Sequence, residues 1–487
     1  MKTILKNWSL VALSLFIFIS CSSDDVTTEP EPETPAEVSI TTFGFYKEDN
    51  PEVLFNDYEV EVTNEAITIN LPKETDLTNL VARFTTTEND IVKVGGVAQI
   101  SGTTANDYTG SVEFLVSEKT TNKIYTVTVG KMASSVWSKI GAYLDDSMRE
   151  ISLAIDLKTS DPYVAYIGSR ESSEERKLNL IGYKGEDWTR IGAKDFSPRA
   201  NSVELNFNKE GTPYVIFQDY DADKQASIMS YEANSWAYVG GAPFSGVKVG
   251  GNTLAIDADN TLYGFYQNDV SRHEDRRNVF LKTSTSGSWS DLPITGRSGA
   301  TRIITSKSVN NEVYLAVMDF GDNQFISVYK YANGTWEVLA DKMRDGEDHT
   351  VYFHNLVMDV DQNGNVYLAY VENTGTATDF QLKVKKYSKE SSTWSTFGDM
   401  IVTTELRDFD IAVDNYGTAM LFYKNETSTP VFVAYDNDVN NWGAAVTFEN
   451  VEADELNIVV APDGIAYAAY LVGDQLYLHK YASPDNQ

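Results

Sequence analysis

The sequence predicts an all-β protein, in which a small β-sandwich is followed by a seven-bladed β-propeller that a Trp-containing strand at residues 137–141 closes. Three observations predict this fold class. Short apolar segments alternate with period two between residues 38 and 131. Beyond them, tryptophans recur every 47 to 58 residues. The repeated unit also lacks its last strand in the final copy, while a spare strand of the same kind precedes the first copy.

The composition excludes several classes of function. There are 71 Asp and Glu against 39 Lys and Arg, which gives a formal net charge of −32 at pH 7. Because polyanions would be repelled, nucleic-acid binding and a basic membrane-surface role are not expected. Hydrophobic residues make up 42% of the chain, which is enough for packed cores. Cys21 is the one cysteine, so an intrachain disulfide and a thiolate metal site are both excluded.

Residues 1–20 have the pattern of a signal peptide. Lys2 and Lys6 precede an apolar run over residues 8–19, which is too short to span a bilayer comfortably. The segment Phe18-Ile19-Ser20-Cys21 resembles a bacterial lipobox, with Phe18 in place of the usual Leu or Val. That resemblance implies cleavage before Cys21, lipidation of its thiol and new amino group, and anchorage in a membrane.

Residues 21–37 form the lipidated cysteine and a disordered tether in this interpretation. They are rich in Pro, Glu and Thr and cannot bury a core. Residues 22–25, Ser-Ser-Asp-Asp, resemble the acidic export signal of Bacteroidota surface lipoproteins. The resemblance implies an outer-membrane protein on the cell surface, with the periplasmic face as the alternative.

Residues 38–131 are expected to form the β-sandwich, because seven short alternating segments are separated by turns. The segment resembles an immunoglobulin-like domain of unknown function that commonly follows the lipobox in Bacteroidota lipoproteins. The residues that give this resemblance are Pro72, Asp76, Leu77, Leu80, Ser101, Gly102, Asp107, Tyr108 and residues 125–127. It implies a spacer or adhesion module without catalytic residues.

Residues 135–484 are expected to form the propeller. Its repeat is set by Trp137, Trp188, Trp236, Trp289, Trp336, Trp394 and Trp442. Each copy divides into four strands, as in the first one at residues 151–156, 163–168, 177–183 and 188–192. Joining the spare strand at 137–141 to the incomplete last copy closes a ring and leaves no open edge. We expect the repeated Trp and Tyr residues to form core between blades. The copies resemble the unassigned Asp-x-x-Gly-x-x-Tyr propeller repeats of bacterial surface proteins, which imply no particular reaction.

The two faces of the predicted propeller differ. The first face, formed by the connections between the first and second strands and between the third and fourth strands, has compact turns. The second face has longer, charged connections at residues 169–176, 219–224, 268–277 and 340–351, and function is placed there, around the mouth of the central channel.

Basic residues recur in the segments that lead from the second face into the first strand of a copy. They are candidates to bind a carboxylate or sulfate group of a ligand. The recurring positions are Arg149, Arg199, Lys248, Arg302, Arg344 and Arg407, and the long connections add Arg272, His273, Arg276 and His349. Interleaved acidic residues favour the alternative, in which the charges form salt bridges in solvent. If the basic ring binds an acidic glycan, Arg149→Ala and Arg407→Ala should abolish that binding.

Two segments have alternating oxygen ligands and resemble calcium loops: Asp219, Asp221 and Asp223, and Asp359, Asp361 and Asn363. The second lacks the glutamate that closes an EF-hand, and a hairpin turn explains it without a metal ion. Calcium is therefore a weak expectation, and no other cofactor is predicted.

Motifs for enzyme chemistry are missing. The four histidines have no metal-ligand spacing, and no Gly-x-Ser-x-Gly elbow or phosphate-binding glycine loop is present. Only fragments of sialidase boxes occur, such as residues 333–336.

The leading hypothesis is a surface-exposed outer-membrane lipoprotein that binds a glycan, a peptide or a partner protein without catalysis. One alternative is an accessory subunit of an outer-membrane barrel complex such as a nutrient importer. Another is a carbohydrate hydrolase or lyase with two convergent acids.

Overall fold

The computed structural model describes residues 38–485, apart from 88–89, 119–120, 169–175, 298, 321–323, 345–349, 374–379, 404–407 and 416. The expectations for the signal peptide, Cys21 and the tether lie outside the described residues. In the described part, the regular elements are β-strands and one 3₁₀ helix, Tyr220–Ala222. No helix of this part is long and apolar enough to cross a membrane. The predicted all-β class is confirmed.

The first nine strands form a two-sheet sandwich. One sheet has the order β2-β1-β4-β7 and the other β3-β9-β8-β5-β6, with β3 and β9 parallel. The strands are β1 (Ile40–Phe45), β2 (Tyr58–Glu61), β3 (Ala66–Leu71), β4 (Leu80–Thr86), β5 (Ile91–Val94), β6 (Val97–Ala98), β7 (Ala105–Asn106), β8 (Val112–Glu118) and β9 (Thr121–Lys131). In β3 alternate residues are buried, as period-two patterning requires. The rings of Phe43, Phe45, Phe114 and Tyr108 meet edge to face in the core between the sheets.

The remaining strands form seven sheets in the arrangement of a β-propeller, and in six of them four antiparallel strands follow one another in sequence order. The first three are β11 (Met148–Ile155), β12 (Pro162–Gly168), β13 (Leu178–Lys184) and β14 (Asp187–Arg190); β15 (Ala200–Phe207), β16 (Pro213–Asp219), β17 (Gln225–Glu232) and β18 (Ser235–Tyr238); and β19 (Val249–Ile256), β20 (Leu262–Asn268), β21 (Val279–Ser284) and β22 (Ser290–Asp291).

The next three are β23 (Thr301–Val309), β24 (Glu312–Asp319), β25 (Ile326–Ala332) and β26 (Thr335–Met343); β27 (Thr350–Val360), β28 (Val366–Asn373), β29 (Phe380–Ser388) and β30 (Thr393–Thr396), with β31 (Ile401–Thr403); and β32 (Phe409–Val413), β33 (Ala419–Lys424), β34 (Pro430–Asp436) and β35 (Asn441–Trp442), with β36 (Val446–Thr447).

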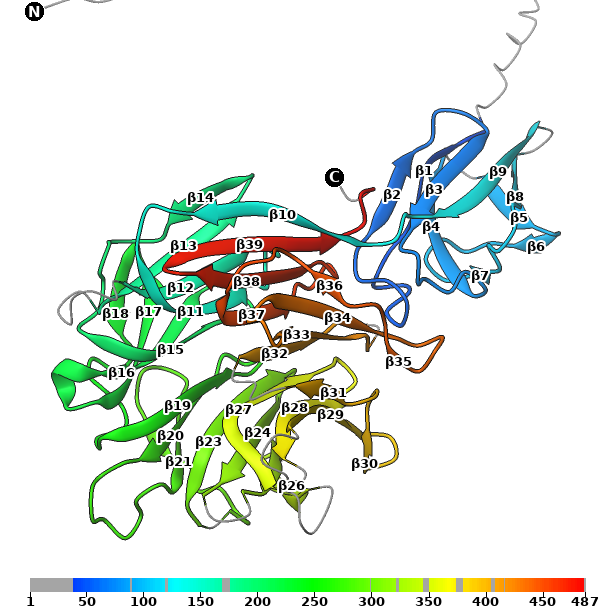
Figure 1. Ribbon diagram of the computed structural model, residues 1–487. Helices are drawn as coiled ribbons and strands as arrows, with labels where there is room; N and C mark the ends of the chain where they lie inside the picture. Colours follow the sequence, from blue (N-terminus) through cyan, green and yellow to red (C-terminus); the bar gives the residue numbers. More distant parts are fainter. Residues whose placement is uncertain are drawn as a thin grey trace, which may run out of the picture.

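The seventh sheet joins the two ends of the propeller. It consists of β37 (Asp454–Val460), β38 (Ala466–Val472), β39 (Gln475–Ala482) and β10 (Val136–Tyr143). β10 lies antiparallel to β39, with Trp137 opposite Tyr481, and Figure 1 shows the two strands side by side. The inner strands also contact one another in a cycle, from β11 through β15, β19, β23, β27, β32 and β37 back to β11. The strand that contains Trp137 thus occupies the fourth position of the last blade.

The tryptophans form core between neighbouring blades, as predicted. Four indole Nε1 atoms donate to a backbone carbonyl that precedes their own blade: Trp236 to Ile191, Trp289 to Val239, Trp394 to Leu339 and Trp442 to Asp399, at 2.8–3.1 Å. These bonds satisfy the polar end of a largely apolar ring where two blades meet.

The compact turns of the first face are held by an acidic residue at their start. Asp361 accepts hydrogen bonds from the backbone N–H of Asn363 and Asn365, and Gly364 has a positive φ of 81°. Asp257 makes the same turn contacts and also accepts a 3.0 Å bond from the hydroxyl of Tyr263. The Asp-x-x-Gly-x-x-Tyr pattern therefore stabilises the turn between the first and second strands of a blade.

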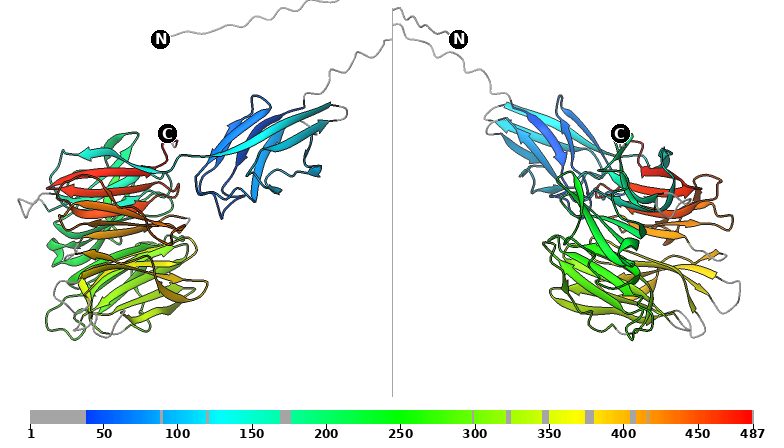
Figure 2. Two further views of the ribbon diagram at one scale, coloured as in Figure 1. Left: turned by 45° about the vertical axis from the view of Figure 1, so that its right-hand side comes forward. Right: turned by 90° about the vertical axis from the view of Figure 1, so that its left-hand side faces the viewer.

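The sandwich lies against the first face of the propeller, as Figure 2 shows. Nδ2 of Asn56 donates to the carbonyl oxygen of Asp463, in the turn between β37 and β38, at 3.1 Å. A cavity of about 440 Å³ lies between the sandwich residues Leu54 and Phe55 and the first-face residues Asp361, Asn415 and Pro462. The sandwich therefore partly covers one end of the central channel, while the second face points away from the sandwich.

Candidate binding site at the mouth of the central channel

The inner strands share an irregularity where they enter from the second face. Register shifts between an inner strand and its neighbour occur at Met148/Glu150, Asn201/Glu204, Val249/Gly251, Thr301/Ile303, Val351/Leu356 and Asp454/Asn457. Each shift is a bulge or a similar irregularity of the ladder, and a bulge bends its strand and redirects the side chains. Such shifts recur near the start of six inner strands, at the mouth of the channel.

A cavity of about 320 Å³ lies at this mouth. Its polar lining is formed by Ser202, Glu204, Asn252, Thr305, Asn355, Asp410 and Asn457. Its apolar lining is formed by Val203, Ile303, Ile304, Leu356, Val357, Phe409 and Leu456. Because the lining comes from six inner strands, the site exists only in the assembled ring. A concave, partly apolar site with a few polar groups is the usual form of a small-molecule binding site.

Hydrogen bonds between blades hold the polar side chains in place. Oδ2 of Asp410 accepts from the N–H of Ile458 at 2.9 Å, and Oε1 of Glu204 accepts from the N–H of Leu254 at 3.4 Å. Nδ2 of Asn355 donates to the carbonyl oxygen of Phe409 at 3.0 Å. Each residue is thus positioned by the strand of the following blade, which pre-organises the cavity.

The charges of the channel are predominantly negative. Burial raises the pKa of Glu204 and of Asp359, and it raises the pKa of Asp410 to about 6. Burial also acts to lower the pKa of Lys307, but the nearby carboxyls of Asp359, Asp410 and Glu204 raise it overall. Nζ of Lys307 lies 3.9 Å from Oδ1 of Asp359, and 44% of the lysine side chain is accessible, so the channel contains open space.

One polar atom of a residue that lines the cavity is buried without a hydrogen-bond partner among the described residues, and it is Oδ1 of Asn252. Asn252 is 8% exposed, and its Nδ2 donates to the carbonyl oxygen of Ser202 at 3.2 Å. Leaving a buried acceptor unsatisfied costs about 1–3 kcal/mol, so this oxygen is suited to accept a bond from a bound molecule.

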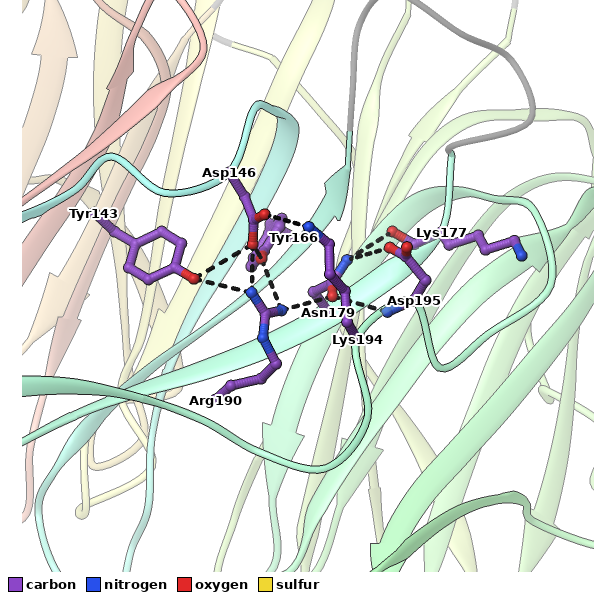
Figure 3. Close-up of polar contacts among 8 residues, drawn as sticks. All are labelled: Tyr143, Asp146, Tyr166, Lys177, Asn179, Arg190, Lys194 and Asp195. Carbon is purple, nitrogen blue, oxygen red and sulfur yellow. Dashed lines mark hydrogen bonds and ion pairs between the residues drawn. The ribbon is translucent and has the colours of Figure 1, made fainter.

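A second polar cluster lies on the second face beside the first blade, shown in Figure 3. Its centre is Asp146, in the connection between β10 and β11, which accepts hydrogen bonds from Arg190, Tyr166, Lys194 and Tyr143. Burial alone would raise the pKa of Asp146, but the bonds from Lys194, Tyr166 and Arg190 hold it well below its usual range. The carboxylate is therefore ionised at neutral pH.

Arg190 also connects this cluster to the hydrogen-bonded pair of Asn179 and Asp195. Nη1 of Arg190 donates to Oδ1 of Asn179 at 2.7 Å, and Nδ2 of Asn179 donates to Oδ1 of Asp195 at 3.0 Å (Figure 3). The side chain of Arg190 is 24% exposed. Because its hydrogen bonds are made within the cluster, the arginine orders the ends of β12, β13 and β14.

The basic residues expected to form a cationic ring mostly contact carboxylates or aromatic rings. Nε of Arg149 lies 3.7 Å from Oε1 of Glu150, Nε of Arg199 lies 2.7 Å from Oδ1 of Asp221, and Nη2 of Arg276 lies 3.1 Å from Oδ1 of Asp269. Arg302 and Arg344 lie over the rings of Phe320 and Phe325. These contacts are those expected of salt-bridged, solvated loops.

The other predicted residues of this set are distributed along the second face. Lys248 precedes β19, and Arg272 has a positive φ of 65° in the connection after β20. Nδ1 of His273 accepts from the N–H of Asp275 at 3.1 Å. His349 and Arg407 lie outside the described residues. None of the described members lines the channel-mouth cavity, so that cavity and the predicted ring are distinct.

The oxygens of the two suggested calcium loops accept hydrogen bonds from the protein itself. Asp219 accepts from the N–H of Asp221 and Ala222 and from the hydroxyl of Tyr238, and Asp221 pairs with Arg199. Asp223 ends the 3₁₀ helix in a left-handed conformation. Asp361 caps the turn that contains Asn363, and Oδ2 of Asp359 accepts from the N–H of Val413. In the described ranges, no group of three or more His, Cys, Asp or Glu side chains could hold a metal ion.

The fold and the site define an all-β protein with a sandwich against one face of a propeller and a polar cavity on the other face. Residues 51–129 match the family described as "SGBP, N-terminal", where SGBP stands for surface glycan-binding protein. A comparison with curated proteins gives no match.

Several solved structures are similar to this chain at low identity. SapL1 lectin in complex with alpha methyl fucoside is 14% identical, covers 62% of this chain and 97% of its own, and has a TM-score of 0.42. AofleA from Arthrobotrys oligospora is 9% identical, with 66% and 90% covered and a TM-score of 0.43. Polysaccharide lyase Uly1 is 11% identical, with 70% and 91% covered and a TM-score of 0.47. No residue role is transferred from these structures.

Proposed function

We propose that this chain is a surface-exposed lipoprotein that binds a glycan through the second face of its propeller, without catalysis. The observation on which the proposal depends is the match of residues 51–129 to the N-terminal domain of surface glycan-binding proteins. In this proposal Cys21 is the lipid anchor, residues 22–37 are the tether, and the sandwich is a spacer.

The contact between the domains supports this division of roles. The sandwich lies on the first face and partly covers that end of the channel, through Leu54, Phe55 and Asn56. The second face is left accessible, at the end of the propeller away from the sandwich. A protein anchored through its N-terminus would therefore present the second face outward.

The channel-mouth cavity has the chemistry of a sugar site. Carboxyl and amide groups from Glu204, Asn252, Asn355 and Asp410 can exchange hydrogen bonds with the hydroxyl groups of a sugar, and Val203, Ile303 and Val357 add apolar side chains to the lining. Since the inner strands fix these groups before a ligand arrives, little conformational entropy is lost on binding.

The experiment uses the mature chain from residue 22, which lacks the cysteine expected to carry the lipid. Affinity electrophoresis and calorimetry against a panel of neutral and acidic polysaccharides should show binding without release of new reducing ends or unsaturated products. Protease treatment of intact cells should cleave the lipidated protein. Failure to bind any glycan, together with stoichiometric recovery of an outer-membrane barrel protein from cells, would replace glycan binding by the accessory-subunit role. Turnover of a polysaccharide would replace it by the enzyme alternative.

A further inference from the structure

We propose that the channel-mouth cavity binds the end of an uncharged glycan, inserted end-on, rather than a stretch along an acidic chain. This inference rests on the proposed function and specifies its ligand class and its site. It is based on the shape of the channel, the balance of its charges and an unsatisfied acceptor.

The channel has one end at which a glycan can enter. The mouth opens on the second face, whereas Pro51, Leu54 and Phe55 of the sandwich line the cavity at the opposite end. Leu54 is 1% exposed and belongs to the core of the sandwich, so it is fixed in place. A polysaccharide cannot thread through such a channel, and only a chain end can enter it.

The size of the cavity agrees with a chain end. Its volume of about 320 Å³ is at the lower limit of ligand sites, which span roughly 300–1,000 Å³. The inner strands surround it laterally, because they contact one another in a closed cycle, and it opens to solvent at the mouth. A terminal sugar can be surrounded in this space, whereas a run of several sugars requires an open groove.

The charges of the channel disfavour an acidic sugar. Among the described residues, the carboxyls of Glu204 and Asp410 line this cavity, whereas the ammonium group of Lys307 pairs with Asp359, which lines the cavity at the opposite end. A carboxylate or sulfate would meet excess negative charge in a partly desolvated site, where like charges repel strongly. The arginines nearest the mouth are paired, as Arg149 is with Glu150. The site therefore favours a ligand with hydroxyl donors and no negative charge.

Asn252 points independently to a bound molecule. The residue is more than nine-tenths buried, it lines the cavity, and its Oδ1 has no hydrogen-bond partner in the described chain. Its Nδ2 is fixed by the carbonyl oxygen of Ser202, so the orientation of the amide is set. A sugar hydroxyl entering the mouth can donate to this oxygen and satisfy it.

Calorimetry with the mature chain and neutral oligosaccharides of defined length tests the inference. Binding should be stoichiometric with chain ends and independent of the number of repeat units, and affinity should vary little with salt because the ligand is uncharged. Asn252→Leu should weaken binding about tenfold or more. The matched control Asn415→Leu changes an asparagine in the cavity at the covered end and should leave affinity unchanged. Circular dichroism and melting temperature verify that both variants fold.

The failures of the inference and of the proposed function are distinguishable. Binding of an acidic polymer in proportion to its repeat units, lost in Arg149→Ala but retained in Asn252→Leu, would overturn the inference and leave glycan binding intact. Equal affinity of Asn252→Leu and the unmodified protein for a neutral chain end would also overturn it. If no glycan in the panel binds, the proposed function itself fails.

Discussion

The backbone N–H of Leu153 donates to Oδ1 of Asn457 at 3.1 Å, which joins the first inner strand of the propeller to the last. Equivalent bonds connect other neighbouring blades. Oγ of Ser152 accepts from the N–H of Leu205, and Oδ2 of Asp410 accepts from the N–H of Ile458, each at 2.9 Å. A β-strand that borders the channel would otherwise expose unpaired N–H groups. Polar residues of the inner strands thus serve as acceptors for a neighbouring blade, and two of them, Asp410 and Asn457, also line the channel-mouth cavity.

We expect Asn457→Leu to destabilise the propeller by about 1–3 kcal/mol, because it leaves the N–H of Leu153 buried without an acceptor. Asn457→Asp retains an acceptor oxygen and should recover part of this loss. Urea unfolding of the mature chain measures the difference. Asn415→Leu, at the other end of the channel, serves as the control. Identical unfolding midpoints for Asn457→Leu and the unmodified chain would show that the bond contributes nothing to closure.

The Asp146 cluster should make the protein sensitive to acid. The pKa of Asp146 in the folded state is below its ordinary value of 3.8, because Lys194, Tyr166 and Arg190 donate to the ionised carboxylate. A lowered folded pKa adds stability above the unfolded value, and this stability is lost as the pH falls through the folded value. Asp146→Asn should therefore cost about 2 kcal/mol near neutral pH, the range of a bond to a charged group, and progressively less below about pH 4. Free energies of unfolding measured over a series of pH values give the cost of Asp146→Asn at neutral pH and its decrease in acid. A cost that is the same at every pH would contradict a lowered pKa of Asp146.

His479 provides a second pH-dependent contribution to stability. The ring is 5% exposed, is stacked on Phe448 at 4.5 Å, and has a buried Nδ1 without a partner in the described chain. Burial lowers its pKa from 6.5 to about 4, so the folded protein holds it neutral. Stability is then complete above about pH 6.5 and declines as the pH falls toward 4, because the unfolded chain binds the proton more readily.

His479→Phe should remove most of that decline, since phenylalanine does not titrate and suits the same aromatic stack. Melting temperatures between about pH 7 and pH 4 should therefore fall less for the variant than for the unmodified chain. His273→Gln is the matched control, because the side chain of His273 is 48% exposed and lies in a loop. Parallel curves for His479→Phe and the unmodified chain would rule out this histidine as the source.

The sequence was sufficient to predict the blades because their signals are local. The period-two burial of β3 and the turn formed by Asp361 and Gly364 depend on residues close together in the chain. The pairing of Trp137 with Tyr481 spans most of the propeller, but it could be predicted because a repeat that starts one strand early must end one strand short.

The channel-mouth cavity could not be predicted in the same way. Glu204, Asn252, Asn355, Asp410 and Asn457 come from different blades, and most of them lie in inner strands that contain other polar residues as well. The recurrence of a polar residue in these strands was the available signal, but only the assembled ring shows that they converge. Likewise, the pairing of Arg190 with Asp146 depends on how β14 packs beside the β10–β11 connection. Charge repetition instead favoured Arg149 and Arg199, which the structure pairs with Glu150 and Asp221.

Trp236 distinguishes a structural role of the repeated tryptophans from a role as sugar-stacking platforms. Its ring stacks on Phe196 at 3.9 Å and 5°, and its Nε1 donates to the carbonyl oxygen of Ile191 at 3.1 Å, both toward the first blade. Trp236→Ala should therefore lower stability by about 2–3 kcal/mol, less than for a fully buried aromatic side chain, because the ring is partly buried against the core between two blades. Glycan affinity of the folded protein, measured well below the melting temperature, should not change, and Trp236→Phe should recover part of the stability. Loss of affinity with an unchanged melting temperature would instead place this tryptophan in the binding site, because a residue that contacts ligand and not core affects binding alone.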